Sequence, residues 1–258
     1  MRPSLLERVP APAKLNLFLH VVGQRADGYH LLQSVFTFVD LCDYLDFEVR
    51  HDGSIVREGE SVAGLAAEHD LIVRAARLLQ QHTGTQYGAS IRCEKNIPAG
   101  AGLGGGSSDA ASTLIALNRL WNTRLSRKQL MHLGLQLGAD VPVFIFGQSA
   151  FAEGIGEQLQ AVKLPDFCYI LLKPDIAVPT PRIFSYKGLT RDQSSIIITD
   201  FTGYQMFADG EFNESVKLFG INNLEPVACK FEDQIGALQK DLIDLKLHAR
   251  MTGSGSAF

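Results

Sequence analysis

The sequence has few cysteines, and they are scattered. Four of its 258 residues are cysteines, and they lie far apart. They are Cys42, Cys93, Cys168 and Cys229. A disulfide scaffold or a zinc ribbon needs dense or closely paired cysteines, and no C-x-x-C pair occurs here. The cysteine pattern therefore indicates reduced, mostly buried thiols in a cytoplasmic protein.

An excess of positive charge is also missing. Lys and Arg number 24 against 28 Asp and Glu, which leaves a net charge of −4. This balance excludes nonspecific electrostatic binding of nucleic acid and a polybasic patch that would bind a membrane surface. No apolar run approaches the roughly 20 residues of a spanning helix, and charged residues interrupt positions 1–16, so we expect neither a membrane segment nor a signal peptide.

Metal-ligand spacings are absent as well. The seven histidines show no H-x-x-x-H or comparable arrangement. A metal-centred enzyme is therefore disfavoured, and the residues that would bind any metal ion are unknown at this stage.

Glycine, by contrast, is present in excess and in clusters. The chain has 24 glycines, five of them between Gly100 and Gly106 and two more at Gly253 and Gly255. Clustered glycines mark backbone that bends sharply or approaches another group closely. The length of 258 residues fits one large domain or two small ones.

Hydrophobic periodicity predicts the main elements. Residues 13–22 alternate as a strand, with Lys14 and Asn16 on one face, where they form either a solvated surface or part of a site. Further strands are expected at 36–39, 44–50, 89–94 and 167–172, and helices at 70–82, 109–121, 126–137, 211–220 and 230–242. The apolar run 141–146, with Pro142 near its start, fits either a strand or a first helical turn.

The densest glycine cluster lies between a predicted strand and a predicted helix. It consists of Pro98, Ala99, Gly100, Ala101, Gly102, Leu103, Gly104, Gly105, Gly106, Ser107 and Ser108. The first N–H groups of a helix lack internal partners, and together with the helix dipole they bind phosphate. Ser107 and Ser108 add hydroxyls, one of which could reach Mg²⁺. We therefore expect a phosphate-binding loop.

Three other nucleotide motifs fit this loop less well. A Walker A loop requires a lysine that the segment does not contain, and a protein-kinase loop requires H-R-D and D-F-G partners that the chain does not have. Gly100, Gly102 and Gly105 do match the dinucleotide pattern G-x-G-x-x-G. However, the acidic residue at the end of a second strand is not in place.

Asp140 stands between a predicted helix and the following apolar run. It is either a turn or N-cap residue or a general base. Kinase chemistry needs a carboxylate to accept a hydroxyl proton, a phosphate loop and a cation, and Asp140, the glycine cluster and Lys14 supply all three.

Four segments of the chain together resemble the GHMP small-molecule kinases. They are PAKLNL (12–17), RADGYH (25–30), PAGAGLGGGSS (98–108) and GADVPVF (138–144), with shorter matches at 179–181 and 252–255. Within that family, the DGYH and GADVP segments resemble members that act on a cytidine diphosphate-methylerythritol. The resemblance implies an α+β, two-lobed GHMP-kinase fold, with a ribosomal protein S5 domain 2-like N-terminal lobe at 1–155. It also implies an α/β C-terminal lobe at 156–258, which is expected to be truncated at its end.

The same resemblance implies the chemistry. ATP with Mg²⁺ would phosphorylate the substrate's 2-hydroxyl in the non-mevalonate isoprenoid pathway, with the loop 98–108 around the phosphates. Asp140 would be the general base, and Lys14 would orient Asp140 and the hydroxyl. Asn16 would contact the substrate near Lys14. The protein would be a cytoplasmic monomer or weak homodimer with a small-molecule substrate.

The resemblance also implies a pyrimidine site. Tyr29 and Phe184 would sandwich the cytosine, and His30 would hydrogen-bond its edge, which is chemistry that suits a flat polar base. Asp70 stands where family members commonly have an asparagine near the nucleotide base, and a carboxylate at that point would prefer hydrogen-bond donors to acceptors.

Three alternatives remain open from the sequence. One is a related kinase for mevalonate-type or homoserine-type substrates, which the DGYH segment disfavours. The second is an NAD(P)H-binding oxidoreductase that uses the G-x-G-x-x-G match. The third is an inert nucleotide-binding module, which the presence of both Lys14 and Asp140 disfavours.

Overall fold

The computed structural model describes residues 4–59, 69–199 and 219–258. The chain divides into two compact units, each built from separate stretches of sequence. The first unit comprises Met1–Ala13, Val39–Ile97 and Gly104–Gly147, and the second comprises Lys14–Phe38, Pro98–Leu103 and Gln148–Phe258. The lobe boundary expected at 155/156 stays a prediction, and the helix expected at 211–220 lies outside the described residues. Over the described ranges, no helix is long and apolar enough to cross a membrane.

Two long paired strands contribute residues to both units. Strand β1 (Leu5–Gln24) pairs with β2 (His30–Arg50) across a turn in which Gly28 has φ 91°. Strand β2 replaces the two short strands expected at 36–39 and 44–50. The polar residues between them interrupt the apolar pattern, but a backbone ladder does not depend on side-chain polarity.

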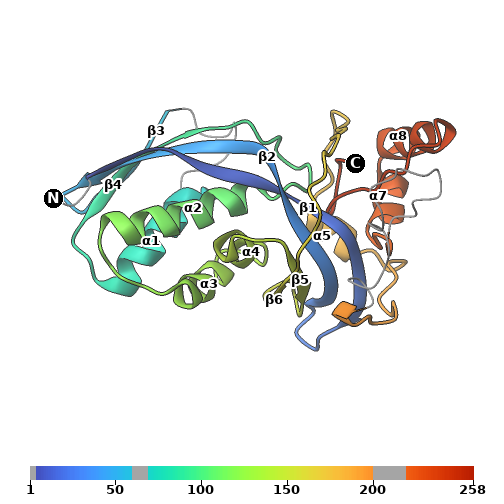
Figure 1. Cartoon of the computed structure of the whole chain (residues 1–258), viewed down its shortest axis with the longest axis horizontal. Coiled ribbons are helices and arrows are strands. Elements are labelled where there is room, and N and C mark those ends of the chain that lie inside the picture. The colour runs from blue at the N-terminus through green and yellow to red at the C-terminus, as the bar shows by residue number, and fades with distance from the viewer. Residues whose placement is uncertain (1–3, 60–68, 200–218) are drawn as a thin grey trace. The chain divides into compact units, whose positions relative to one another are not determined.

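The first unit is a sheet with helices on one side (Figure 1). Strand β2 pairs antiparallel with β4, with Phe47 opposite Ile91, and β3 pairs parallel with β4. The remaining elements are β3 (Ile55–Glu58), β4 (Gly88–Glu94), α1 (Leu71–Thr83), α2 (Gly105–Leu120), α3 (Arg127–Leu135) and α4 (Val141–Phe146). The layers produce the expected α+β class.

Local signals set the helix ends in this unit. Asp70 caps α1 by accepting a hydrogen bond from the Ile72 N–H at 2.8 Å, and Gly84 ends the helix at φ 66°. A capping box at Ser126 begins α3, as expected. The run 141–146 is a helix, because Pro142 occupies its first turn, where a missing N–H costs nothing.

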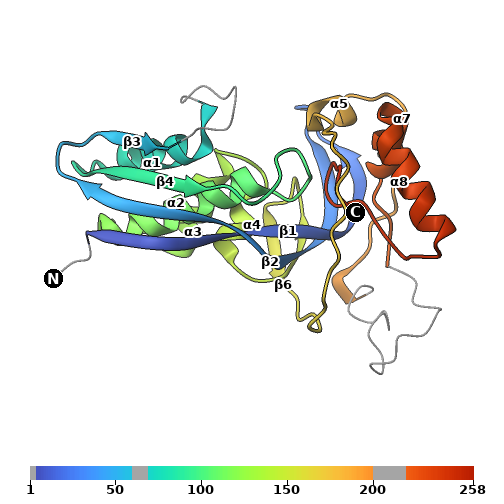
Figure 2. The same ribbon diagram turned by 90° about the horizontal axis from the view of Figure 1, so that it is seen from above.

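The second unit combines a small sheet with helices (Figure 2). Strand β5 pairs antiparallel with β2, with Val35 opposite Phe151, and forms a hairpin with β6. The elements are β5 (Ala150–Glu153), β6 (Gln158–Ala161), α5 (Thr180–Phe184), α7 (Glu225–Phe231) and α8 (Asp233–Asp244). Ile183, Leu224, Ile235 and Met251 are at most 1% exposed in its core.

Two predictions fail in the second unit. Residues 167–172 form no strand, and Ile170 is 84% exposed. A strand requires a run of hydrogen bonds to a neighbouring backbone. In this segment Leu172 exchanges hydrogen bonds with Phe258 at 2.9 and 3.0 Å, and one such pair does not make a strand. The helix expected at 230–242 is instead split at Glu232, which has extended backbone and pairs with Arg182 at 3.0 Å.

The buried face of α2 allows a direct test of the first unit's core. Leu114 is fully buried, whereas its neighbour Ile115 is 43% exposed. We expect Leu114→Ala to lower the free energy of unfolding by about 2–5 kcal/mol, because it leaves a cavity. Ile115→Ala should cost less than about 1 kcal/mol. Chemical denaturation measures both values, and equal losses would contradict this packing.

Candidate active site

The glycine loop alternates two backbone conformations. Gly100, Gly102 and Gly104 have φ of 64°, 75° and 73°, and the side chains between them, Ala101 and Leu103, are at most 2% exposed. Residues other than glycine rarely adopt positive φ. Alternation of this kind turns successive N–H groups toward one concavity, which is an anion-binding nest. The geometry therefore supports a phosphate-binding loop.

Close packing also requires glycine at position 102. A Cβ there would lie 2.1 Å from the Thr252 carbonyl oxygen. The loop is further held by a hydrogen bond from the Lys14 N–H to the Leu103 oxygen at 3.0 Å and by one from Ala257 to Ala101 at 3.2 Å. The segment 98–103 is thus fastened to β1 and to residues 252–257.

Helix α2 begins inside the glycine run, four residues before the expected start at Asp109. Its N-cap is Gly104, and the first turn contains Ser107 and Ser108. Ser108 is fully buried, and among the described residues none hydrogen-bonds to its hydroxyl. A buried polar atom without a partner is costly, so the helix start fits a polar ligand such as a phosphate group with its cation.

A buried ion cluster supports this first turn from within the same unit. Lys95 hydrogen-bonds to Asp43 and, at 2.6 Å, to Asp109, while Asp43 also accepts from the Asn96 and Ile97 N–H groups. The cluster connects β2, the segment after β4 and α2. Asp43 and Lys95 belong to no sequence motif, so the cluster was not predicted.

Asp140 occupies the N-cap position of α4, yet its side chain makes no capping hydrogen bond. Its carboxylate therefore does not cap α4. The preceding Gly138 lies beside α2, since a Cβ at this position would be 3.9 Å from the Ser107 hydroxyl. The loop that carries Asp140 thus adjoins the start of α2.

Lys14 and Asn16 form a buried pair on β1, not a solvated face. They are 3% and 6% exposed, and the Lys14 ammonium donates to the Asn16 side chain. The Asn16 amide donates to Ser34 at 2.7 Å, and the Asn16 N–H donates to the Thr252 hydroxyl at 2.9 Å. Burial of a charge in a hydrogen-bonded network is typical of a functional position.

The second glycine motif lies against the same lysine. A Cβ on Gly253 would be 3.0 Å from the Lys14 Nζ. Asn222 holds this segment by donating to the Met251 and Gly253 carbonyls at 2.6 and 2.9 Å. Asn222 belongs to no motif and was not predicted, and Thr252, although it lies in the matched segment 252–255, was given no role.

The three residues expected at the pyrimidine site all lie in the second unit. The His30 and Phe184 rings pack with centroids 4.9 Å apart, and Tyr29 is 58% exposed. The structure thus brings His30 and Phe184 together, and the sandwich of a base between Tyr29 and Phe184 stays a prediction.

Comparison with known proteins identifies the family. The GHMP kinases N terminal domain matches residues 70–148. A 4-diphosphocytidyl-2-C-methyl-D-erythritol kinase of Bordetella bronchiseptica is 57% identical over 96% of this chain and 79% of its own length, and one of Ralstonia nicotianae is 53% identical over 98% and 84%. The chain belongs to the 4-diphosphocytidyl-2-C-methyl-D-erythritol kinase family. The family resemblance in the sequence is confirmed.

Solved structures agree with this kinase family. A 4-(cytidine 5'-diphospho)-2C-methyl-D-erythritol kinase superposes with a TM-score of 0.79 at 34% identity, covering 98% of this chain and 88% of that one. A homoserine kinase from Cytophaga hutchinsonii, at 15% identity and a TM-score of 0.64, covers 100% and 84% and shares the fold alone. The chain is a small-molecule kinase, for which the family implies ATP, and the oxidoreductase alternative is wrong.

Asp70 stands at the position where kinases of this family commonly have asparagine. Its carboxylate binds other groups of the protein. One carboxylate oxygen caps α1, and the other lies 3.3 Å from the Arg57 Nε, with both side chains largely buried. Asp70 therefore serves the start of α1, which explains how a carboxylate is accommodated there.

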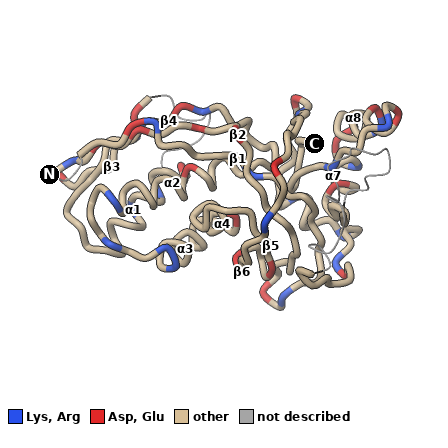
Figure 3. The backbone as a smooth tube through the Cα atoms, viewed as in Figure 1, with Lys and Arg blue, Asp and Glu red and all other residues tan. Residues whose placement is uncertain are grey.

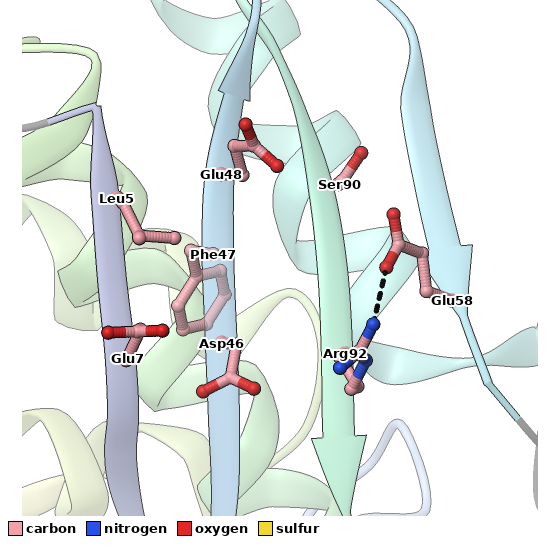
Figure 4. A pocket seen from close by; sticks show the side chains of 8 residues that line it. All are labelled: Leu5, Glu7, Asp46, Phe47, Glu48, Glu58, Ser90 and Arg92. Carbon is pink, nitrogen blue, oxygen red and sulfur yellow. Dashed lines mark hydrogen bonds and ion pairs between the residues drawn. The ribbon is translucent and has the colours of Figure 1, made fainter.

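A separate pocket opens on the outer face of the first unit's sheet, with helices behind the strands (Figure 4). Glu7, Asp46, Glu48 and Glu58 line it, and Arg92 pairs with Glu58 at 3.3 Å. By contrast, the charged side chains of helices α1 and α3 are all basic (Figure 3). Several carboxylates repel a phosphate, so this pocket does not suit the kinase's nucleotide.

Asp109 gives the kinase a pH-dependent stability. Burial raises the pKa of its carboxyl to about 7, although Lys95 lowers it. In the unfolded chain this carboxyl ionises near pH 3.9. Between about pH 4 and 7 the folded state therefore retains a proton that the unfolded state has lost. The contribution of Asp109 to stability falls as pH rises through this range. We expect the melting temperature of Asp109→Asn, relative to the parent chain, to be higher at pH 8 than at pH 5.

The exposed Asp241→Asn is the matched control, and its difference from the parent should not change with pH. Calorimetry at both pH values measures the effect. An Asp109→Asn difference that is constant with pH would contradict the raised pKa.

Proposed function

We propose that this chain transfers the γ-phosphoryl group of ATP to the 2-hydroxyl of 4-diphosphocytidyl-2-C-methyl-D-erythritol. The observation that carries the proposal is the position of Asp140 in a loop that adjoins the first turn of α2, where Ser108 buries an unpartnered hydroxyl. Relatives at 52–57% identity carry the name of that kinase, and the substrate is taken from this name.

In the proposed reaction the substrate oxygen forms a bond to the γ-phosphorus. The bond from that phosphorus to the bridging oxygen breaks, and ADP leaves with the electron pair. Asp140 accepts the hydroxyl proton. The N–H groups of the glycine loop and of the α2 start hold the phosphates.

Lys14 contributes positive charge to the transition state. Its ammonium is buried and held by Asn16, so little reorganisation is needed when charge develops on the transferring group. Orientation of Asp140 and the hydroxyl by Lys14, and a substrate contact by Asn16, are parts of the proposal. A bound Mg²⁺ would neutralise phosphate charge, and the Ser107 or Ser108 hydroxyl is the nearest candidate ligand.

The cytosine would lie against Phe184 and the exposed ring of Tyr29, with His30 at its polar edge. The packing of His30 on Phe184 supports a shared site for an aromatic base. Cytoplasmic location and a monomeric or weakly dimeric state complete the proposal.

The substrate is tested by ADP release in the presence of ATP and Mg²⁺. We expect turnover with 4-diphosphocytidyl-2-C-methyl-D-erythritol and none with mevalonate or homoserine. If only another alcohol is turned over, the chain is still a kinase, but the proposed cytidine substrate is wrong.

The general base is tested by Asp140→Asn. We expect kcat to fall by about 10²–10⁴-fold with little change in the affinity for ATP, because the amide cannot accept the proton. Asp241→Asn removes an exposed carboxylate and should leave kcat unchanged. Near-parental turnover of Asp140→Asn would remove Asp140 from the role of base.

A further inference from the structure

Arg191 is held by a group of carbonyl oxygens after α5. Its guanidinium donates to the oxygens of Phe184 and Tyr186 at 3.0 and 2.8 Å and to that of Leu189 at 3.0 Å. These contacts fix the plane of the guanidinium and, at the same time, the backbone of Phe184. All of these residues belong to the second unit.

The Nε–H of this guanidinium contacts an aromatic residue of the expected pyrimidine site. The Arg191 Nε lies 3.0 Å from the His30 Nε2, and the His30 ring packs on Phe184 at an interplanar angle of 32°. Arg191 therefore touches both His30 and Phe184, although 161 residues separate it from His30 in the chain.

The chemistry of this contact determines the form of the imidazole. Arginine stays protonated in proteins and can only donate hydrogen bonds. The His30 Nε2 must therefore present a lone pair, which requires a neutral ring with its proton on Nδ1. Burial lowers the pKa of His30, and the nearby charge of Arg191 lowers it further, in agreement with a neutral ring.

We propose that Arg191 is a positioning residue that holds His30 as the neutral Nδ1–H tautomer, so that His30 offers a hydrogen-bond donor to an acceptor on the cytosine edge. This inference rests on the proposed function for the identity of the base. The tautomer itself follows from contacts within the unliganded protein. Without Arg191 the imidazole can place its proton on Nε2 or become charged, and the donor is no longer fixed.

The tautomer is measured first, in the unliganded full chain. Long-range proton–nitrogen NMR of ¹⁵N-histidine-labelled protein should show a protonated Nδ1 and an unprotonated Nε2 for His30 at neutral pH. The His30 signals are assigned as those lost in His30→Gln. A ring that carries its proton on Nε2, or on both nitrogens, in the parent chain would overturn the proposal.

The positioning role is measured with Arg191→Met, which retains the length of the side chain but has no donor. We expect the His30 signals to shift toward the Nε2–H form and KM for the cytidine substrate to rise about 5- to 30-fold, as for loss of one well-placed hydrogen bond. KM for ATP should be unchanged, and kcat should stay within about threefold of the parent value.

Arg182→Met is the matched control, because Arg182 is an arginine of the same unit, on α5, but pairs with Glu232 and lies over Phe231. It should change neither the His30 signals nor KM. Unchanged tautomer or unchanged substrate KM in Arg191→Met would overturn the positioning role. If the cytidine substrate is not turned over by the parent chain, the proposed function fails, and the NMR result still decides the tautomer.

Discussion

The approach of two glycine segments in the second unit is the constraint on which the site depends. Gly102 packs on the Thr252 carbonyl, and Gly253 lies against both the Gly102 carbonyl and the ammonium of Lys14. A Cβ at either glycine would separate these backbones. A buried ammonium is tolerated only when its hydrogen bonds are satisfied, and Asn16 supplies one partner. The glycine loop, β1 and residues 252–255 therefore support one another.

In the first unit, charged side chains support the start of α2. In the proposed function the start of α2 presents N–H groups and hydroxyls to an anion, and this requires contacts that hold its first turns in place. The buried contact of Lys95 with Asp43 and Asp109 does this, and it leaves Asp109 with a raised pKa. Removal of Lys95 would leave the buried carboxyl groups of Asp43 and Asp109 without this cation, so the cluster both positions the helix and makes the stability of the kinase depend on pH.

The candidate site residues that could be named from the sequence lie in short consecutive segments. Three short motifs are of this kind: the glycine loop, the turn before His30 and the segment around Asp140. The residue types in each motif indicate its chemistry. Asn222, Asp43 and Arg191 make structural contacts of comparable importance and were not predicted, and Thr252, which lies in the matched segment 252–255, was given no role. Each acts on a residue more than 25 positions away, for example Arg191 on His30 across 161 residues. A single polar residue without a motif gives no sign of its partner.

The sequence by itself determined the elements whose signals lie within about four residues. Asp70 and Gly84 set the ends of α1, Ser126 begins α3, and Pro142 fits the first turn of α4. The tertiary structure decided the burial of Lys14, the continuity of β2 and the absence of a strand at 167–172. Caps and turns are satisfied by hydrogen bonds to near neighbours. Burial and strand pairing depend on distant backbone, and local periodicity contains no information about that backbone.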